Sequence, residues 1–181
     1  MASFFDHIPQ KQKAFIAEQK MFFVATAPET GGRVNLSPKG LDSFHILDDN
    51  TVAYMDLTGS GNESAAHTLQ NGRITVMFCG FEKQPMILRL YGTGRVVNTR
   101  SPEWEELAGH FELLAGARQI MVIKVSSVQT SCGFGVPYYT FNGERPTLVA
   151  YTEKAGDEKM IAYRAEKNVQ SIDGLPTPPL D

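Results

Sequence analysis

The sequence predicts a mainly β (α+β) fold: an antiparallel β-barrel, closed or split, with flanking helices. Seven strand-like runs are joined by connections short enough for hairpins, and helical patterns interrupt the strands in two places rather than alternating with them. Asp48, Asp49 and Asn50 between two of these runs form a typical hairpin signal. These observations favour an antiparallel barrel over a doubly wound parallel sheet.

The first part of the chain is predicted to hold one helix and four strands. Residues 9–19 have a helical pattern, with Ile8, Phe15 and Ile16 on the apolar side. Strand-like runs follow at 21–26, 34–36, 43–47 and 51–55.

The later elements begin with a short helix after a glycine-rich turn. Its apolar stripe is predicted at Ala65, Ala66 and Leu69, and Gly72 is expected to close it. Strands are predicted at 73–79, 86–97 and 119–130. Ser101 and Pro102 favour the start of another helix, since serine caps helices and proline suits their first position. The residues expected on the buried face of that helix are Trp104, Leu107, Phe111 and Leu114.

Composition limits the function classes. The net charge is -3 with scattered basic residues, so we expect no nucleic-acid partner. No apolar run approaches the length of a membrane helix, so we expect no membrane span. Cys79 and Cys132 are expected to be free thiols in a reducing compartment, which predicts a cytoplasmic protein.

Two regions are predicted. Residues 1–170 are expected to form a single domain, and 171–181 an extended C-terminal arm, because Pro176, Pro178 and Pro179 exclude a helix or sheet interior. An arm of this composition has little reason to be ordered alone, so we expect it to pack across a partner subunit in a homodimer.

The turn from Gly59 to Ser64 is the most informative motif. Small polar residues and glycines before a helix start favour an anion site, because the first amides of a helix are unpaired and point outward. This pattern predicts a phosphorylated small molecule as ligand. The alternative is a capped helix alone, because Ser60 and Glu63 match the capping-box spacing.

Two further segments offer polar groups for such a ligand. Ser37 and Lys39, followed by Gly40, could bind phosphate at the end of a strand, although a plain exposed turn explains them equally simply. Arg89 lies in the middle of a strand between Ile87 and Tyr91, which indicates either a charge kept for a ligand or a structural ion pair.

Together these segments resemble the pyridoxamine 5′-phosphate oxidase-like family of flavin-binding split barrels. The similarity covers residues 21–130. The segments that carry it are 34–40, 54–77 and 87–97, with Ala66-His67 and Asn71-Gly72-Arg73-Ile74 in the family's order. The resemblance implies a split barrel and a homodimer that binds FMN in grooves between subunits.

The resemblance also implies a cofactor-binding set: Ser37, Lys39, Gly40, Tyr54, Met55, Asp56, Thr58, Gly59, Ser60, Asn62, Ser64 and Arg89. Residues 54–58 would contribute backbone along the flavin ring. The true oxidase carries an Arg-Lys pair where this chain has Ser64 and Ala65, so we expect a separate branch with another substrate. The expected activity is that of an FMN-dependent oxidoreductase acting on a small molecule. The alternatives are a non-catalytic flavin- or haem-binding protein, a deazaflavin-dependent protein, and a structural barrel with an empty groove.

Overall fold

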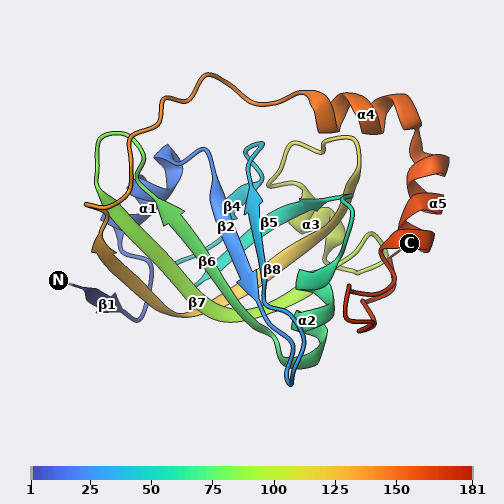
Figure 1. Ribbon diagram of the computed structural model, residues 1–181, viewed down its shortest axis with the longest axis horizontal. Helices are drawn as coiled ribbons and strands as arrows, with labels where there is room; N and C mark the ends of the chain where they lie inside the picture. Colours follow the sequence, from blue (N-terminus) through green and yellow to red (C-terminus); the bar gives the residue numbers. More distant parts are fainter. Residues whose placement is uncertain (1, 181) are drawn as a thin grey trace.

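The computed structural model describes residues 2–180 as one curled antiparallel sheet with helices around it (Figure 1). The sheet order is β3-β2-β6-β7-β8-β5-β4, and β1 pairs with β8. The strands are β1 (Ser3–Phe5), β2 (Phe22–Thr26), β3 (Asn35–Lys39), β4 (Phe44–Ile46), β5 (Thr51–Leu57), β6 (Arg73–Cys79), β7 (Met86–Val97) and β8 (Ala117–Cys132). The predicted antiparallel split barrel is confirmed.

The helices are α1 (Gln10–Glu18), α2 (Glu63–Asn71), α3 (Trp104–Ala108), α4 (Thr147–Ala155) and α5 (Asp157–Lys167). The predicted helix at 9–19 is confirmed as α1, with Phe15 and Ile16 buried. The predicted length of the helix after Pro102 is wrong, because α3 begins at Trp104 and is only five residues long. Leu107 is buried, but the other three residues expected on its buried face are only partly covered.

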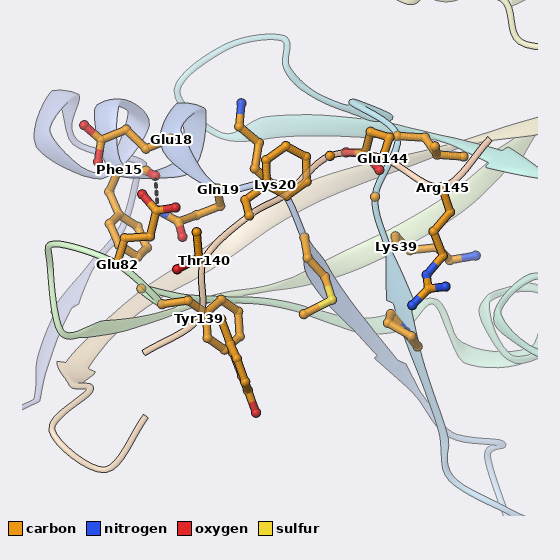
Figure 2. A pocket seen from close by; sticks show the side chains of 18 of the residues that line it. Phe15, Glu18, Gln19, Lys20, Lys39, Glu82, Tyr139, Thr140, Glu144 and Arg145 are labelled. Carbon is orange, nitrogen blue, oxygen red and sulfur yellow. Dashed lines mark hydrogen bonds between the residues drawn. The ribbon is translucent and has the colours of Figure 1, made fainter. Parts of the chain in front are cut away.

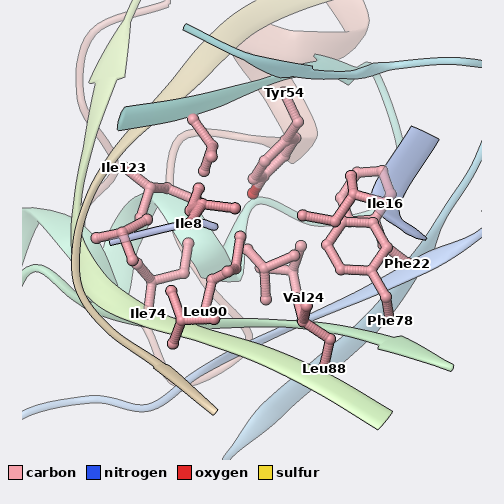
Figure 3. Close-up of a cluster of buried hydrophobic side chains, with 14 of the residues drawn as sticks. Ile8, Ile16, Phe22, Val24, Tyr54, Ile74, Phe78, Leu88, Leu90 and Ile123 are labelled. Atoms are coloured by element: carbon pink, nitrogen blue, oxygen red, sulfur yellow. The ribbon is translucent and has the colours of Figure 1, made fainter. Parts of the chain in front are cut away.

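The alternation predicted for β7 is confirmed. Leu88 and Leu90 are fully buried inside the barrel, and Ile87, Arg89 and Tyr91 face the other side. Figure 3 shows Leu88 and Leu90 packed with Tyr54, Phe22 and Val24 in the main core. A second core lies on the other face of β5, where α3 covers it.

The helix α2 packs differently from the prediction. Ala65 and Ala66 are buried as expected, but Leu69 is 54% exposed, and His67 is buried in its place. Gly72 ends the helix with a left-handed φ of 69°, as predicted, and this conformation favours glycine.

Part of the C-terminal region was not predicted. The chain leaves β8, crosses in an extended segment to α4 and α5, and returns along α2 (Figure 1). The arm predicted at 171–181 is described up to residue 180. It has no helix or named strand and lies against its own chain, where Arg33 pairs with Asp173 and Asn98 donates to the carbonyl of Pro179. Its contact with a partner subunit stays a prediction.

The two cysteines are free thiols, as predicted. None of the helices formed by the described residues has the length and apolar character needed to cross a bilayer.

Candidate functional site

The first part of the site is a polar strip between β3 and the start of α2. Ser37 Oγ donates to Asn35 Oδ1 (3.1 Å), and Asn35 Nδ2 donates to Ser64 Oγ (3.0 Å). Asn35 and Ser37 lie opposite Thr26 and Val24, whose side chains point into the barrel. The predicted residues Ser37 and Ser64 are therefore joined through Asn35, which sequence reasoning did not single out.

Tyr54 lies within the same end of the barrel and is fully buried. Its hydroxyl makes no hydrogen bond of normal geometry to the described residues, although the side chain of Ser64 lies near enough to oppose the rise in its pKa. Burial raises the pKa of this hydroxyl well above its ordinary value, and the nearby carboxylate of Asp56 acts in the same direction. The Tyr54 hydroxyl is thus neutral and buried away from solvent. Burying such a group costs free energy unless a ligand or a water molecule forms a hydrogen bond with it.

Asp56 is the centre of the charged part of the site. Its carboxylate accepts from Lys39 Nζ (2.5 Å), Arg118 (2.6 Å) and Gln119 Nε2 (2.8 Å). Burial alone would raise the pKa of this carboxyl, but the charges of Arg118 and Lys39 overcome the effect and hold the pKa well below its ordinary value. Asp56 is therefore ionised, and it neutralises one of its two cationic partners.

Arg118 and Gln119 connect this charge to the glycine turn. Arg118 is 3% exposed and donates to the carbonyl of Gly61 (3.0 Å), and Gln119 donates to Asn62 Oδ1 (2.8 Å). Neither residue belongs to the predicted site. The signal that could have found them is a pair of hydrogen-bonding side chains at the start of an otherwise apolar strand.

The outer side of the glycine turn is covered by the chain's own C-terminal region. Asn168 is fully buried, donates to the carbonyl of Gly59 (3.1 Å), and accepts from Arg118 (2.7 Å). Asn62 donates to the carbonyl of Asn168 (3.3 Å), and Glu63 accepts from the amide of Ile172 (3.3 Å). The carbonyls of the turn are therefore engaged in internal contacts.

The capping-box interpretation of this turn is wrong. The helix starts at Glu63 with Asn62 as its N-cap, so Ser60 lies outside the capping position, and the Asn62 side chain makes no cap hydrogen bond. Thr58, also in the predicted set, donates to the carbonyl of Gly116 (2.9 Å) and has a structural contact.

Arg89 does not join the other predicted residues within one chain. Lys39 lies opposite Phe22, which points into the core, whereas Arg89 lies opposite Met77 and hence on the side of Phe23. The two cations are on opposite faces of the sheet. Arg89 donates to Ser131 Oγ (3.4 Å) on the outer face.

The remaining predicted residues take different places. Met55 is buried in the second core, so only its backbone can face the site. Gly40 and Lys39 line a cavity beside the end of β3. Ser60 is exposed at the tip of the turn.

Comparison with known proteins identifies the family. The model of the pyridoxamine 5′-phosphate oxidase family matches residues 8–132. The chain is also 36% identical to the pyridoxamine 5′-phosphate oxidase family protein ustO of Aspergillus flavus, over 97% of this chain and 78% of that protein. The chain therefore belongs to the pyridoxamine 5′-phosphate oxidase family.

Solved structures agree on the fold. HupZ of Group A Streptococcus has a TM-score of 0.53 at 24% identity and covers 67% of this chain and 91% of that one. A Lactobacillus delbrueckii protein that carries the family's name has a TM-score of 0.55 at 13% identity, over 68% and 94% of the two chains. The FAD binding protein of Mycobacterium smegmatis has a TM-score of 0.50 at 12% identity, over 70% and 97%.

The polar, uncharged groups of the site are suited to binding a flavin. A buried hydroxyl at Tyr54 without a hydrogen bond of normal geometry and the hydroxyls of Ser37 and Ser64 suit the hydroxyl-bearing chain and ring edge of such a cofactor. A phosphate meets mostly neutral donors, because Lys39 and Arg118 share the carboxylate of Asp56.

Proposed function

We propose that this chain is an FMN-dependent oxidoreductase that acts on a small molecule and holds its flavin between two copies of itself. The observation that carries the proposal is the Tyr54 hydroxyl, which is buried without a hydrogen bond of normal geometry and lies beside Ser64 in the strip of Ser37, Asn35 and Ser64. Membership of the family and the fold shared with a FAD binding protein support a flavin as the cofactor.

The chain's own residues would bind and orient the cofactor. Ser37 and Ser64 present hydroxyls to the ribityl and phosphate oxygens, and the ammonium of Lys39 lies at the end of β3, held there by Asp56. The backbone of residues 54–58 would run along the flavin ring. The bound flavin supplies hydride or electron transfer, and the protein excludes water and sets the ring's hydrogen bonds.

The outer face of the sheet supports a homodimer. A row of residues that lie opposite one another runs across six strands on this face: Phe4, Gln129, Arg89, Met77, Phe23 and Pro38. Phe4 is 66% exposed, and Phe23 and Met77 are only partly covered. An apolar face of this kind favours association, and it would bring Arg89 toward the second copy's groove.

The absorption spectrum of the purified protein tests the proposal. We expect a two-banded flavin spectrum after incubation with FMN and desalting, and reduction of this flavin by a nicotinamide or another small reductant. A bound flavin that no reductant reduces would support non-catalytic binding instead. Lack of any retained flavin would contradict the proposal.

Two variants test the assigned residues. Lys39→Ala and Arg89→Ala should each weaken FMN binding by about 1.5–3 kcal/mol, the size of a hydrogen bond to a charged group. Lys124→Ala is the control, since Lys124 is exposed and contacts Thr51 away from the site. Unchanged FMN affinity in both site variants would refute the residue assignment. A monomer by light scattering would refute the shared groove.

A further inference from the structure

A cavity of about 1080 Å³ lies outside the polar strip. It is enclosed by the end of α1, the end of β3, the β6–β7 turn and the C-terminal segment of residues 139–151 (Figure 2). This volume is slightly above the range of about 300–1,000 Å³ that is usual for small-ligand pockets in proteins. The segment 139–151 lies beyond the part of the chain that the family model matches.

The wall formed by this segment is aromatic and accessible. Tyr139, Phe141 and Tyr151 line the cavity and are 63%, 45% and 51% exposed. Tyr139 contacts the ring of Phe81 across the cavity wall, with centroids 5.4 Å apart and an interplanar angle of 51°. Large apolar side chains are rarely exposed together around one concavity unless the concavity binds something. Flat rings on this wall favour a planar aromatic ligand.

Positively and negatively charged side chains both line the cavity. Figure 2 shows Lys39 and Arg145 in one part of the cavity, with Glu144 near them, and Glu18 and Glu82 in another. The lining carries four cations and three carboxylates, an excess of one positive charge. Lys39 is paired with Asp56, whereas Arg145 has no ion pair in the part of the chain that the structure describes. Lys20 and Lys83 also line the cavity without an ion pair among the described residues, but Arg145 is the arginine of the set and can bind an anionic group through two parallel hydrogen bonds.

We propose that this cavity binds a planar aromatic molecule that carries a single anionic group, with its ring against Tyr139 and its anionic group at Arg145. Binding here needs no flavin. Lys39 and Gly40 border both this cavity and the proposed flavin site, so the molecule would lie beside the flavin as the second reactant. That role, unlike the binding itself, rests on the proposed function.

Titration with 2-naphthoate, and with 2-naphthamide as its uncharged counterpart, tests the proposal by calorimetry on the purified full-length protein. We expect saturable binding of one naphthoate per chain and weaker binding of the amide. Tyr139→Ala should weaken naphthoate binding about tenfold, the value of one aromatic contact. Tyr138→Ala is the matched control, because Tyr138 is 85% exposed and does not line the cavity. It should change the affinity less than about twofold.

Arg145→Gln tests the anion contact, and it should bring the affinities for naphthoate and naphthamide together. Since Tyr139 and Arg145 are exposed, both variants should keep the wild-type thermal transition, which confirms that they fold. Equal effects of the Tyr138 and Tyr139 substitutions, or no binding at millimolar naphthoate, would overturn the proposal. Displacement of naphthoate by FMN would also overturn it, because the cavity would then be the flavin's own site. A protein that binds naphthoate but no FMN would keep this inference and lose the proposed function.

Discussion

Asp56 should dominate the stability of this end of the barrel. Asp56→Asn keeps the shape of the side chain but removes the charge that Arg118 and Lys39 share. Arg118 is 3% exposed, so its guanidinium would remain buried without a counter-ion. Breaking a buried pair in this way costs about 3–5 kcal/mol. We therefore expect the free energy of unfolding of Asp56→Asn to fall by about that amount at pH 7.

Lys39→Gln provides the comparison within the same network. The Lys39 side chain is 23% exposed and can be replaced by water, and Asp56 keeps its contacts to Arg118 and Gln119. Its loss should cost about 1.5–3 kcal/mol at most. Urea unfolding followed by circular dichroism gives both values, provided that the slope m is unchanged.

The pH dependence gives an independent test of the Asp56 charge. The folded-state pKa of Asp56 lies well below its ordinary value of about 3.9, so its contribution is fully present above pH ~4 and is lost as the pH falls below that value. Wild-type stability should therefore decline more steeply than that of Asp56→Asn between about pH 4 and pH 2. A loss smaller than about 1 kcal/mol at pH 7, or parallel pH curves, would refute the reasoning.

Three further predictions concern other elements. Asn168→Ala should destabilise the fold by about 2–4 kcal/mol in urea, because it removes the buried contacts to Arg118 and Gly59. Asn98→Ala, which removes hydrogen bonds to Pro179, Arg100 and Ser101 nearer the surface, should cost less, about 1 kcal/mol. Gly92→Ala should cost about 1–3 kcal/mol by thermal unfolding, since its Cβ would lie 2.3 Å from the carbonyl oxygen of Lys124, whereas Gly135→Ala, in open space, should be neutral. Burial lowers the pKa of His67, so the neutral imidazole contributes to stability above about pH 6.5, and this contribution is lost as the pH falls. His67→Gln should therefore make the free energy of unfolding depend less on pH between about pH 7 and 5. The same pH dependence in the variant and the wild type would contradict this prediction.

The elements that were predicted correctly are those with a local signal. The alternation in β7, the hairpin at residues 48–50 and the positive φ of Gly72 each depend on neighbouring residues only. The helices α4 and α5 were missed because they lie outside the resemblance and bury few residues, with Thr152, Met160 and Arg164 as their main buried side chains. A weakly amphipathic sequence resembles a loop when its packing partner is unknown.

The role of the predicted site residues stays a prediction, but the structure shows which of them lie together. Ser37, Lys39, Asp56 and Ser64 do gather at one end of the barrel. The contacts that organise them join residues far apart in the chain, such as Asp56 with Arg118 and Asn62 with Asn168. No local pattern specifies such pairs, because they form only when β5 and β8 lie side by side and the C-terminal region folds back.

Burial at the start of α2 suits the small residues found there, where the resemblance implies an Arg-Lys pair in the true oxidase. Ser64 and Ala65, which replace the expected Arg-Lys pair, are 8% and 0% exposed. The segment that runs from Asn168 to Ile172 contacts the turn and Glu63 from outside. Long basic side chains at these two buried positions would lose much of their hydration, at a high desolvation cost. Small residues in the helix and the folded-back segment are therefore one structural solution, and the charge of the site is concentrated instead on Asp56 and its two cationic partners.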